Sequence, residues 1–149
     1  IEDDGFVLWE PAAIILYLAR RNAARLWPST VHGEGRMLQW AFFTATQIEP
    51  PMNTLHEHRV RLPERERNAA IADNCQRRLL EKLGVLEVQL AATPYFGGVR
   101  WDLSDFIVAS ALYAIYEMKL DLVQVPKVDR WLTRSVQRPA AREAIMLRA

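Results

Sequence analysis

Hydrophobic positions along this chain recur mostly at the three- and four-residue spacing of amphipathic helices, except between residues 106 and 116. That stretch is apolar on nearly every side, and only Ser110 interrupts it. A helix that is apolar on every face is buried, and this one is too short and too closely flanked by charge to cross a membrane. The pattern therefore predicts an all-α bundle in which other helices surround a buried central helix, within residues 101–120.

The start of the central helix carries its own signals. Gly97 and Gly98 supply a loop before it. Asp102 can accept a hydrogen bond from a backbone N–H in the first turn, and Asp105 can reach back as in a capping box. We therefore expect these two carboxylates to fix the residue at which the helix begins.

Proline and capping signals divide the rest of the chain into further helices, because proline is favoured at the first helical position and disfavoured in the interior. They predict helices over residues 11–21, 35–47, 63–92, 126–138 and 139–147, with a break or kink at Pro50-Pro51. The helix over 63–92 carries an inward apolar stripe at spacings of three and four residues. This stripe consists of Ile71, Cys75, Leu79, Leu83, Leu86 and Leu90.

The first nine residues predict the remains of a β-hairpin. Asp4-Gly5 is a typical hairpin turn, and residues 6–9 read as a short strand. We expect its partner just before residue 1, with at most Ile1 and Glu2 present, since a lone strand leaves backbone groups unpaired. This pattern indicates that sequence upstream of Ile1 is missing. The loop over residues 22–35 is the best candidate for a domain boundary.

Composition fits a globular protein with one sizeable core. The chain has 149 residues, half of them hydrophobic, and a formal net charge of +1. With so small a net charge, the chain has no overall electrostatic field that would attract nucleic acid or an anionic membrane. Acidic residues also alternate with the arginines on the helical faces, which argues against a nucleic-acid-binding surface. The one cysteine, Cys75, forms no disulfide within the chain. Because the sequence shows no signal peptide or transmembrane run, we expect a cytoplasmic protein.

Few side chains suggest catalytic or metal chemistry. His56 and His58 are two residues apart, which suits a strand and not one helix face, so we expect no metal site. Cys75 lies on the apolar stripe, so we interpret it as a small buried residue in preference to a nucleophile. Glu10 stands directly before Pro11 at a helix start. It is either a carboxylate stabilised by the helix dipole or half of a small-ligand site, and the local sequence leaves both open.

Four segments of the chain resemble the glutathione transferase family, in the order that the family has them. Residues 4–14 look like the family's last strand and the acid-serine turn that opens its third helix. Residues 38–51 look like the first helix of its all-helical domain, and residues 95–105 look like the loop and capping box before its buried central helix. Residues 131–140, with a tryptophan and an Arg-Pro-Ala sequence, look like its closing helices.

The resemblance implies a domain organisation and a reaction. Residues 1–27 would be a remnant of the thioredoxin-like glutathione-binding domain, and residues 28–149 would be the helical C-terminal domain. Members of the family conjugate glutathione, as a substrate, to hydrophobic electrophiles. They place the Tyr, Ser or Cys that activates the thiol, and a cis-proline, near the start of the thioredoxin-like domain. Neither position exists here, so no residue inherits the catalytic role and this chain alone is expected to be inactive.

The resemblance also implies binding residues. Glutathione would be bound at Glu10, Pro11 and Ala12, although Pro11 replaces the family's usual Ser and so removes a hydroxyl and a backbone N–H. That change should weaken glutathione binding. The residues expected to line the hydrophobic substrate pocket are Trp40, Phe43, Thr44, Gln47, Tyr113 and Tyr116. For each of these six, packing in the core is the alternative that the sequence leaves open.

The implied partners are a small-molecule electrophile and a second copy of the chain in a homodimer, with no nucleic acid, membrane or metal. The alternative is a non-catalytic helical interaction or ligand-carrying module of the same fold, as in some translation factors, and Pro11 favours it modestly. A third possibility is a chain that is stable only as a dimer, which covers apolar side chains around Phe6, Trp9 and Tyr17. The acceptor substrate, the transferase class and the catalytic residue type are open questions at this point.

Overall fold

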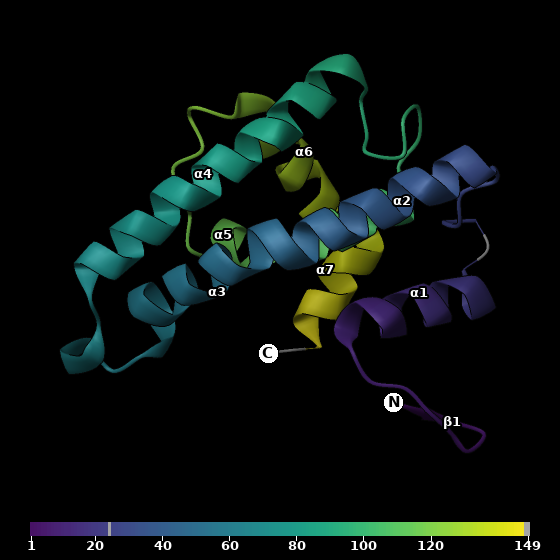
Figure 1. Cartoon of the computed structure of the whole chain (residues 1–149), viewed down its shortest axis with the longest axis horizontal. Helices are drawn as coiled ribbons and strands as arrows, with labels where there is room; N and C mark the ends of the chain where they lie inside the picture. The colour runs from purple at the N-terminus through teal and green to yellow at the C-terminus, as the bar shows by residue number, and fades with distance from the viewer. Residues whose placement is uncertain (24, 148–149) are drawn as a thin grey trace.

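The protein is a helical bundle preceded by a two-stranded hairpin (Figure 1). The computed structural model describes residues 1–23 and 25–147. Its elements are β1 (Glu2–Asp3), β2 (Phe6–Val7), α1 (Pro11–Asn22), α2 (Val31–Phe43), η1 (Thr44–Ile48), α3 (Glu49–His56), η2 (Glu57–Arg61), η3 (Glu64–Glu66), α4 (Ala69–Ala92), α5 (Leu103–Glu117), α6 (Pro126–Val136) and α7 (Pro139–Met146). The all-α architecture predicted from the sequence is confirmed.

The hairpin forms from the chain's own first residues. β1 pairs antiparallel with β2, in the register Glu2 to Val7 and Asp3 to Phe6. Asp4 and Gly5 both have positive φ, at 51° and 81°, as a two-residue hairpin turn requires. The predicted turn is therefore confirmed, but the expectation that the partner strand lies before residue 1 is wrong, because Glu2–Asp3 supplies it.

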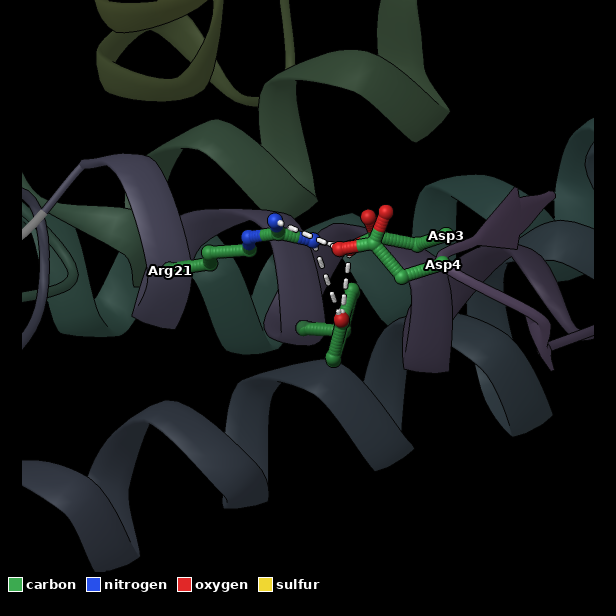
Figure 2. A network of polar contacts seen from close by, with 4 residues as sticks. Asp3, Asp4 and Arg21 are labelled. Atoms are coloured by element: carbon green, nitrogen blue, oxygen red, sulfur yellow. Dashed lines mark hydrogen bonds and ion pairs between the residues drawn. The ribbon is translucent and has the colours of Figure 1, made fainter.

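A polar network attaches the hairpin to α1. Figure 2 shows Asp3 and Asp4 of the hairpin facing Arg21 near the end of the helix. Arg21 forms an ion pair with Asp3, and its second terminal nitrogen lies 3.7 Å from Asp4. The Tyr17 hydroxyl donates a hydrogen bond of 2.7 Å to the same Asp3 carboxylate, and the Tyr17 ring packs against Phe6. These contacts hold two short strands that could not persist alone.

The helical run from α2 to α3 is continuous in Figure 1. It begins four residues earlier than predicted, because the Thr30 side chain caps it by accepting a 3.0 Å hydrogen bond from Gly33 N–H. The predicted break at Pro50-Pro51 appears as a π-helical turn, η1, that precedes the prolines. Wider π-helical turns place a proline in the first turn of the next segment, where its missing N–H costs no helical bond.

The long helix α4 begins at Ala69, so the expectation that Pro63 opens it is wrong. Pro63 precedes a single 3₁₀ turn, after which Arg67 is extended. The Arg67 guanidinium donates to the carbonyls of Val60 at the end of η2 and of Leu62, at 2.7 and 2.8 Å, and the Asn68 side chain then caps the helix by accepting from Ile71 N–H. These side-chain bonds place the helix start six residues later than proline placement alone predicts.

The inward stripe of α4 is largely as predicted. Its buried residues are Ala72, Cys75, Leu79, Leu83 and Leu86. Ile71 is 40% exposed and so does not belong to it, because the neighbouring Ala72 occupies the inward position at three residues from Cys75. The stripe packs on α3 and α6 and forms, with α5, the main hydrophobic core.

α5 lies at the centre of the bundle and contacts α1, α2, α3 and α6. Five of its apolar residues are buried: Leu103, Ile107, Val108, Leu112 and Ile115. The expectation of burial on every face is wrong for one side, since Phe106 and Tyr116 are each 39% exposed. That side borders a pocket described below.

A second, smaller core joins the first helix to the bundle. Ala19 of α1, two residues of α2 and two of α5 are buried together in it. A backbone bond of 3.0 Å from Leu103 N–H to Leu26 carbonyl ties the loop after α1 to the start of α5. These contacts pack α1 and the loop residue Leu26 against α2 and the start of α5.

Candidate functional site

One buried carboxylate, Asp105, fixes the start of α5 and the loop beside the pocket. It accepts hydrogen bonds from the backbone N–H groups of Phe96, Gly97 and Asp102 at 3.1 to 3.2 Å, and from the Trp131 indole at 2.8 Å. Burial raises the pKa of this carboxyl above its ordinary value, and the four N–H donors partly oppose that rise. Its environment is structural, with all four partners supplied by the fold.

The capping box predicted from the sequence is present. Asp102 accepts from Ser104 N–H at 2.9 Å, while Asp105 accepts from Asp102 N–H. Gly97 approaches this pair so closely that a Cβ there would overlap the Asp102 carboxylate. Glycine at this position is therefore required by space, which the loop signal in the sequence did not specify.

A pocket of about 410 Å³ lies along the side of α5 that carries Phe106 and Tyr113. We call it the α5–α7 pocket, because α5, the end of α6 and α7 form its walls. Its lining is mostly apolar and aromatic, with two serines and one arginine. The lining residues are Leu26, Trp101, Phe106, Ala109, Ser110, Tyr113, Ser135, Val136, Arg138, Ala140, Ala141, Ala144 and Ile145. This size and lining are those of a small-molecule site.

Trp101 occupies one wall of the pocket in a fixed orientation. Its indole N–H donates to the Ser135 hydroxyl at 3.2 Å, and its ring meets Phe106 edge-on at 6.4 Å between centroids. The Arg138 guanidinium carbon lies 3.9 Å from the centre of the Trp101 ring, a close cation–π contact. Three contacts thus hold an aromatic surface and a cation together at the pocket.

The structure places the six predicted pocket residues in three different environments. Tyr113 lines the α5–α7 pocket, and Tyr116 stacks on it at 6.4 Å between ring centroids. Trp40 and Thr44 are buried, and Phe43 packs partly buried against the same core. Gln47 is exposed and donates only to its neighbour Thr46. Of the six, Tyr113 alone is among the residues that line this pocket, and it also packs against the core that contains Trp40.

Two of the buried residues leave polar atoms without a hydrogen-bond partner. The Trp40 indole N–H and the Thr44 hydroxyl are both enclosed and unpartnered among the described residues. Trp40 meets Phe43 and Phe96 edge-on at 5.9 and 4.7 Å between centroids, so aromatic packing fixes its ring. Their predicted role in a substrate pocket stays a prediction.

The predicted glutathione-binding residues lie together at the start of α1. Glu10 has φ 80°, a left-handed conformation that is uncommon for a residue with a side chain, and it makes no capping bond. Pro11 occupies the first helical position and is exposed, while Ala12 is partly buried. A strained residue ahead of an uncapped helix turns its carboxylate toward solvent, and its contact with glutathione stays a prediction.

Sequence reasoning missed Trp101, Phe106, Ser110, Ser135 and Arg138 as pocket residues. One signal was available within α5: Ser110 is the single polar interruption, and Phe106 and Tyr113 lie four before it and three after it on the same face. The contact between residues 101 and 138 gave no local signal, because it depends on how α7 returns to α5.

Other kinds of site are not seen in the part of the chain that is described. Within residues 1–23 and 25–147, no three His, Cys, Asp or Glu side chains gather as a metal site needs. Over the same residues, no helix combines the length and the apolarity that crossing a bilayer requires. Cys75 is buried in the main core as a free thiol.

Comparison with known proteins gives the chain relatives of two kinds. A family model described as the glutathione S-transferase C-terminal domain matches residues 36–139. Glutathione S-transferase GstB of Escherichia coli K12 is 24% identical over 147 residues, covering 98% of this chain and 71% of GstB. Human elongation factor 1-gamma is 25% identical over 146 residues, covering 96% of this chain but 32% of the factor.

The solved structures that superpose on this chain include glutathione transferases. The theta class glutathione S-transferase of Xanthomonas axonopodis pv. citri, in its apo form, superposes with a TM-score of 0.90 at 30% identity, covering 97% of this chain and 78% of that chain. Its glutathione-bound form gives a TM-score of 0.89. Ure2p5 of Phanerochaete chrysosporium, cocrystallized with 1-(S-glutathionyl)-2,4-dinitrobenzene, gives 0.85 at 27% identity, covering 97% and 70%.

The family model spans well over half of the chain, and the region it matches contains the buried capping box and the central helix around which the bundle is built. The helical bundle described above is also the fold that the superposed transferases share. The chain therefore belongs to the glutathione S-transferase family.

Proposed function

We propose that this chain supplies the helical, electrophile-binding part of a glutathione transferase, with the α5–α7 pocket holding the hydrophobic substrate. The observation that carries the proposal is the mostly apolar 410 Å³ pocket along α5, in a chain of this family. Residues 1–27 would belong to the glutathione-binding domain and residues 28–149 to the helical domain. Glu10 and the N–H groups at the start of α1 would meet one end of glutathione.

The related structures support this choice of reaction. One theta class relative is described with glutathione bound, and Ure2p5 is described with a glutathionyl dinitrobenzene conjugate. A conjugate of that type combines a charged tripeptide with an aromatic ring, and the aromatic part needs an apolar pocket. Phe106 and Tyr113 offer such a surface on α5.

The test is conjugation of glutathione to 1-chloro-2,4-dinitrobenzene, followed by absorbance of the product. We expect turnover when residues 1–149 follow a complete thioredoxin-like domain, and none from residues 1–149 alone, because the family resemblance implies that the thiol-activating residue belongs to that domain. Replacing Ala109 with Trp should fill the pocket and abolish turnover while the protein stays folded. Unchanged turnover in the Ala109→Trp protein would place the electrophile elsewhere.

A second candidate function is a non-catalytic binding module. The match to elongation factor 1-gamma and the proline at position 11 favour it, since Pro11 supplies neither a hydroxyl nor an N–H to a ligand. Retention on immobilised glutathione discriminates the two, because a transferase should be retained and eluted by free glutathione. A Pro11→Ser variant should bind more strongly if the start of α1 contacts glutathione.

We also propose that the protein forms a homodimer. Phe6, Val7 and Trp9 are 52%, 67% and 75% exposed, and Phe42 on α2 is 68% exposed. Large exposed apolar side chains of this kind favour association when they gather in one patch. Analytical ultracentrifugation should show a dimer that a Trp9→Glu substitution weakens, and a monomer at all concentrations would refute the proposal.

A further inference from the structure

A small hollow lies where α6 packs against the end of α4 (Figure 1), and it shares no lining residue with the α5–α7 pocket. We call it the α4–α6 hollow. Its volume is about 120 Å³, which is below the range of pockets that hold drug-sized ligands and suits a small ionic group. The residues that line it are Leu90, Pro94, Lys127, Arg130, Trp131 and Arg134.

Three of these residues are cations on one face of α6. Lys127, Arg130 and Arg134 are three and four residues apart, so their side chains leave the helix on the same side. No acidic side chain of the described residues lines the hollow with them. Like charges that converge on one hollow repel one another, and an anion bound between them would turn that repulsion into attraction.

The protein's own groups do not account for the three charges. Within the described residues, no ion pair or hydrogen bond joins these side chains to another group, and none of them donates to a carbonyl at the end of α4. The Glu87 carboxylate lies near the start of α6, where it accepts the backbone N–H groups of Lys127 and Val128 at 2.9 to 3.1 Å. It offsets at most one of the three charges, so the hollow keeps an excess of positive charge.

We propose that the α4–α6 hollow binds a phosphate group, with Lys127, Arg130 and Arg134 contacting its oxygens. A guanidinium donates pairs of parallel N–H bonds to phosphate oxygens, and a lysine ammonium adds a compact charge. A phosphate monoester carries a charge of about −1.5 to −2 on three acceptor oxygens, which three cations match better than they match a single carboxylate. This site is separate from the proposed substrate pocket, and the inference does not depend on the proposed function.

Trp131 provides a reporter inside the site. Its side chain lines the hollow, and its indole N–H is held by the 2.8 Å bond to Asp105. An anion bound in the hollow should therefore shift the NMR signal of this N–H without any rearrangement of the fold. Backbone amides of residues 127–134 should respond with it.

The experiment titrates inorganic phosphate into the protein at constant ionic strength and follows amide and indole chemical shifts, with sodium acetate as the comparison. We expect saturable shifts at residues 127–134 and at the Trp131 indole, and binding of phosphate about tenfold tighter than that of acetate. Shifts that never saturate, or equal affinities for phosphate and acetate, would overturn the inference.

Variants assign the binding to named side chains. Arg130→Gln and Arg134→Gln should each weaken phosphate binding up to about fivefold, because each removes one exposed ionic contact, and the double variant should lose saturable binding. Arg78→Gln is the matched control, since Arg78 is also exposed on a helix but does not line the hollow. Binding that survives in the double variant, or that weakens equally in Arg78→Gln, would overturn the assignment.

A phosphate group of this kind can belong to a soluble ester or to a lipid headgroup, and vesicles separate the two. The protein is sedimented with phosphatidylcholine vesicles prepared with and without phosphatidic acid. Cosedimentation that needs phosphatidic acid and is lost in the Arg130→Gln, Arg134→Gln double variant would identify a lipid headgroup. Phosphate binding in solution without cosedimentation would identify a soluble phosphate ester, and binding in neither assay would overturn the proposal.

Discussion

Replacing Asp105 with Asn should destabilise the protein strongly, because a single amide oxygen cannot serve the donors that the carboxylate serves. One carboxylate oxygen accepts from Phe96 N–H and the Trp131 indole, and the other accepts from Gly97 and Asp102 N–H. Asparagine keeps one acceptor oxygen and places an NH₂ group, which cannot accept, against the two N–H donors that the other carboxylate oxygen served. Two donors, at least one of them buried, then lose their partner.

The size of the effect follows from these two stranded donors. Each buried donor left without an acceptor costs about 1–3 kcal/mol, so the substitution should lower the free energy of unfolding by about 2–6 kcal/mol. A domain of this size is stable by about 5–15 kcal/mol, so the variant should fold but unfold at much lower denaturant. Urea titration followed by far-UV circular dichroism and Trp fluorescence measures this difference.

Asp129→Asn is the control for charge removal, because Asp129 is exposed in the first turn of α6. Loss of its interaction with the helix dipole should cost under about 1 kcal/mol. An Asp105→Asn protein within about 0.5 kcal/mol of the wild type would refute the account of Asp105 as the acceptor for four donors. That outcome would mean that the loop repacks or that water replaces the lost acceptor.

The raised pKa of Asp105 gives the same variant a pH dependence with a defined sign. A group with a higher pKa in the folded state holds its full contribution below its unfolded pKa, about 3.9, and loses it as pH rises through the folded pKa. Burial penalises the ionised carboxylate relative to the neutral carboxyl, whereas asparagine is neutral at every pH. The stability gap between wild type and Asp105→Asn should therefore be largest below about pH 4 and should narrow as pH rises through the folded pKa. A gap that widens as pH rises would contradict the direction of the shift.

Three further substitutions test other parts of the fold. Thr44→Val should leave stability unchanged or raise it by up to about 1 kcal/mol in urea titration, since it removes a buried hydroxyl that has no partner. Glu87→Gln should cost about 1–2 kcal/mol by the same measurement, because the Glu87 carboxylate accepts the first two free N–H groups of α6, with the exposed Glu81→Gln as control. Tyr17→Phe removes the hydroxyl that donates to Asp3 while keeping the ring, so amide exchange of the hairpin should speed up about fivefold, and unchanged exchange would contradict the network.

Helix positions were predictable wherever a local signal decides them. The capping pair Asp102 and Asp105 and the prolines at 11, 126 and 139 act on their own neighbours, and the structure begins helices at or beside each of them. Pro63 was misread because more than one such signal is present. Two local signals compete there, and the Asn68 side chain, which accepts from Ile71 N–H three residues on, starts the helix in place of Pro63, while Arg67 bonds back to the Leu62 carbonyl.

The pocket shows why a site is harder to predict from sequence than a helix. The apolar run in α5 suggested burial on all sides. A helix face that lines a cavity is also apolar, however. Composition therefore does not distinguish a face packed against other side chains from one that lines a pocket. Only the return of α7 toward α5 decides between them. It brings Arg138 onto Trp101, with Ser135 holding the ring, and so places a cation beside an apolar wall. Substitutions in the last two helices should therefore alter the shape of this pocket, while the capping box formed by Asp102 and Asp105 fixes the residue at which α5 begins.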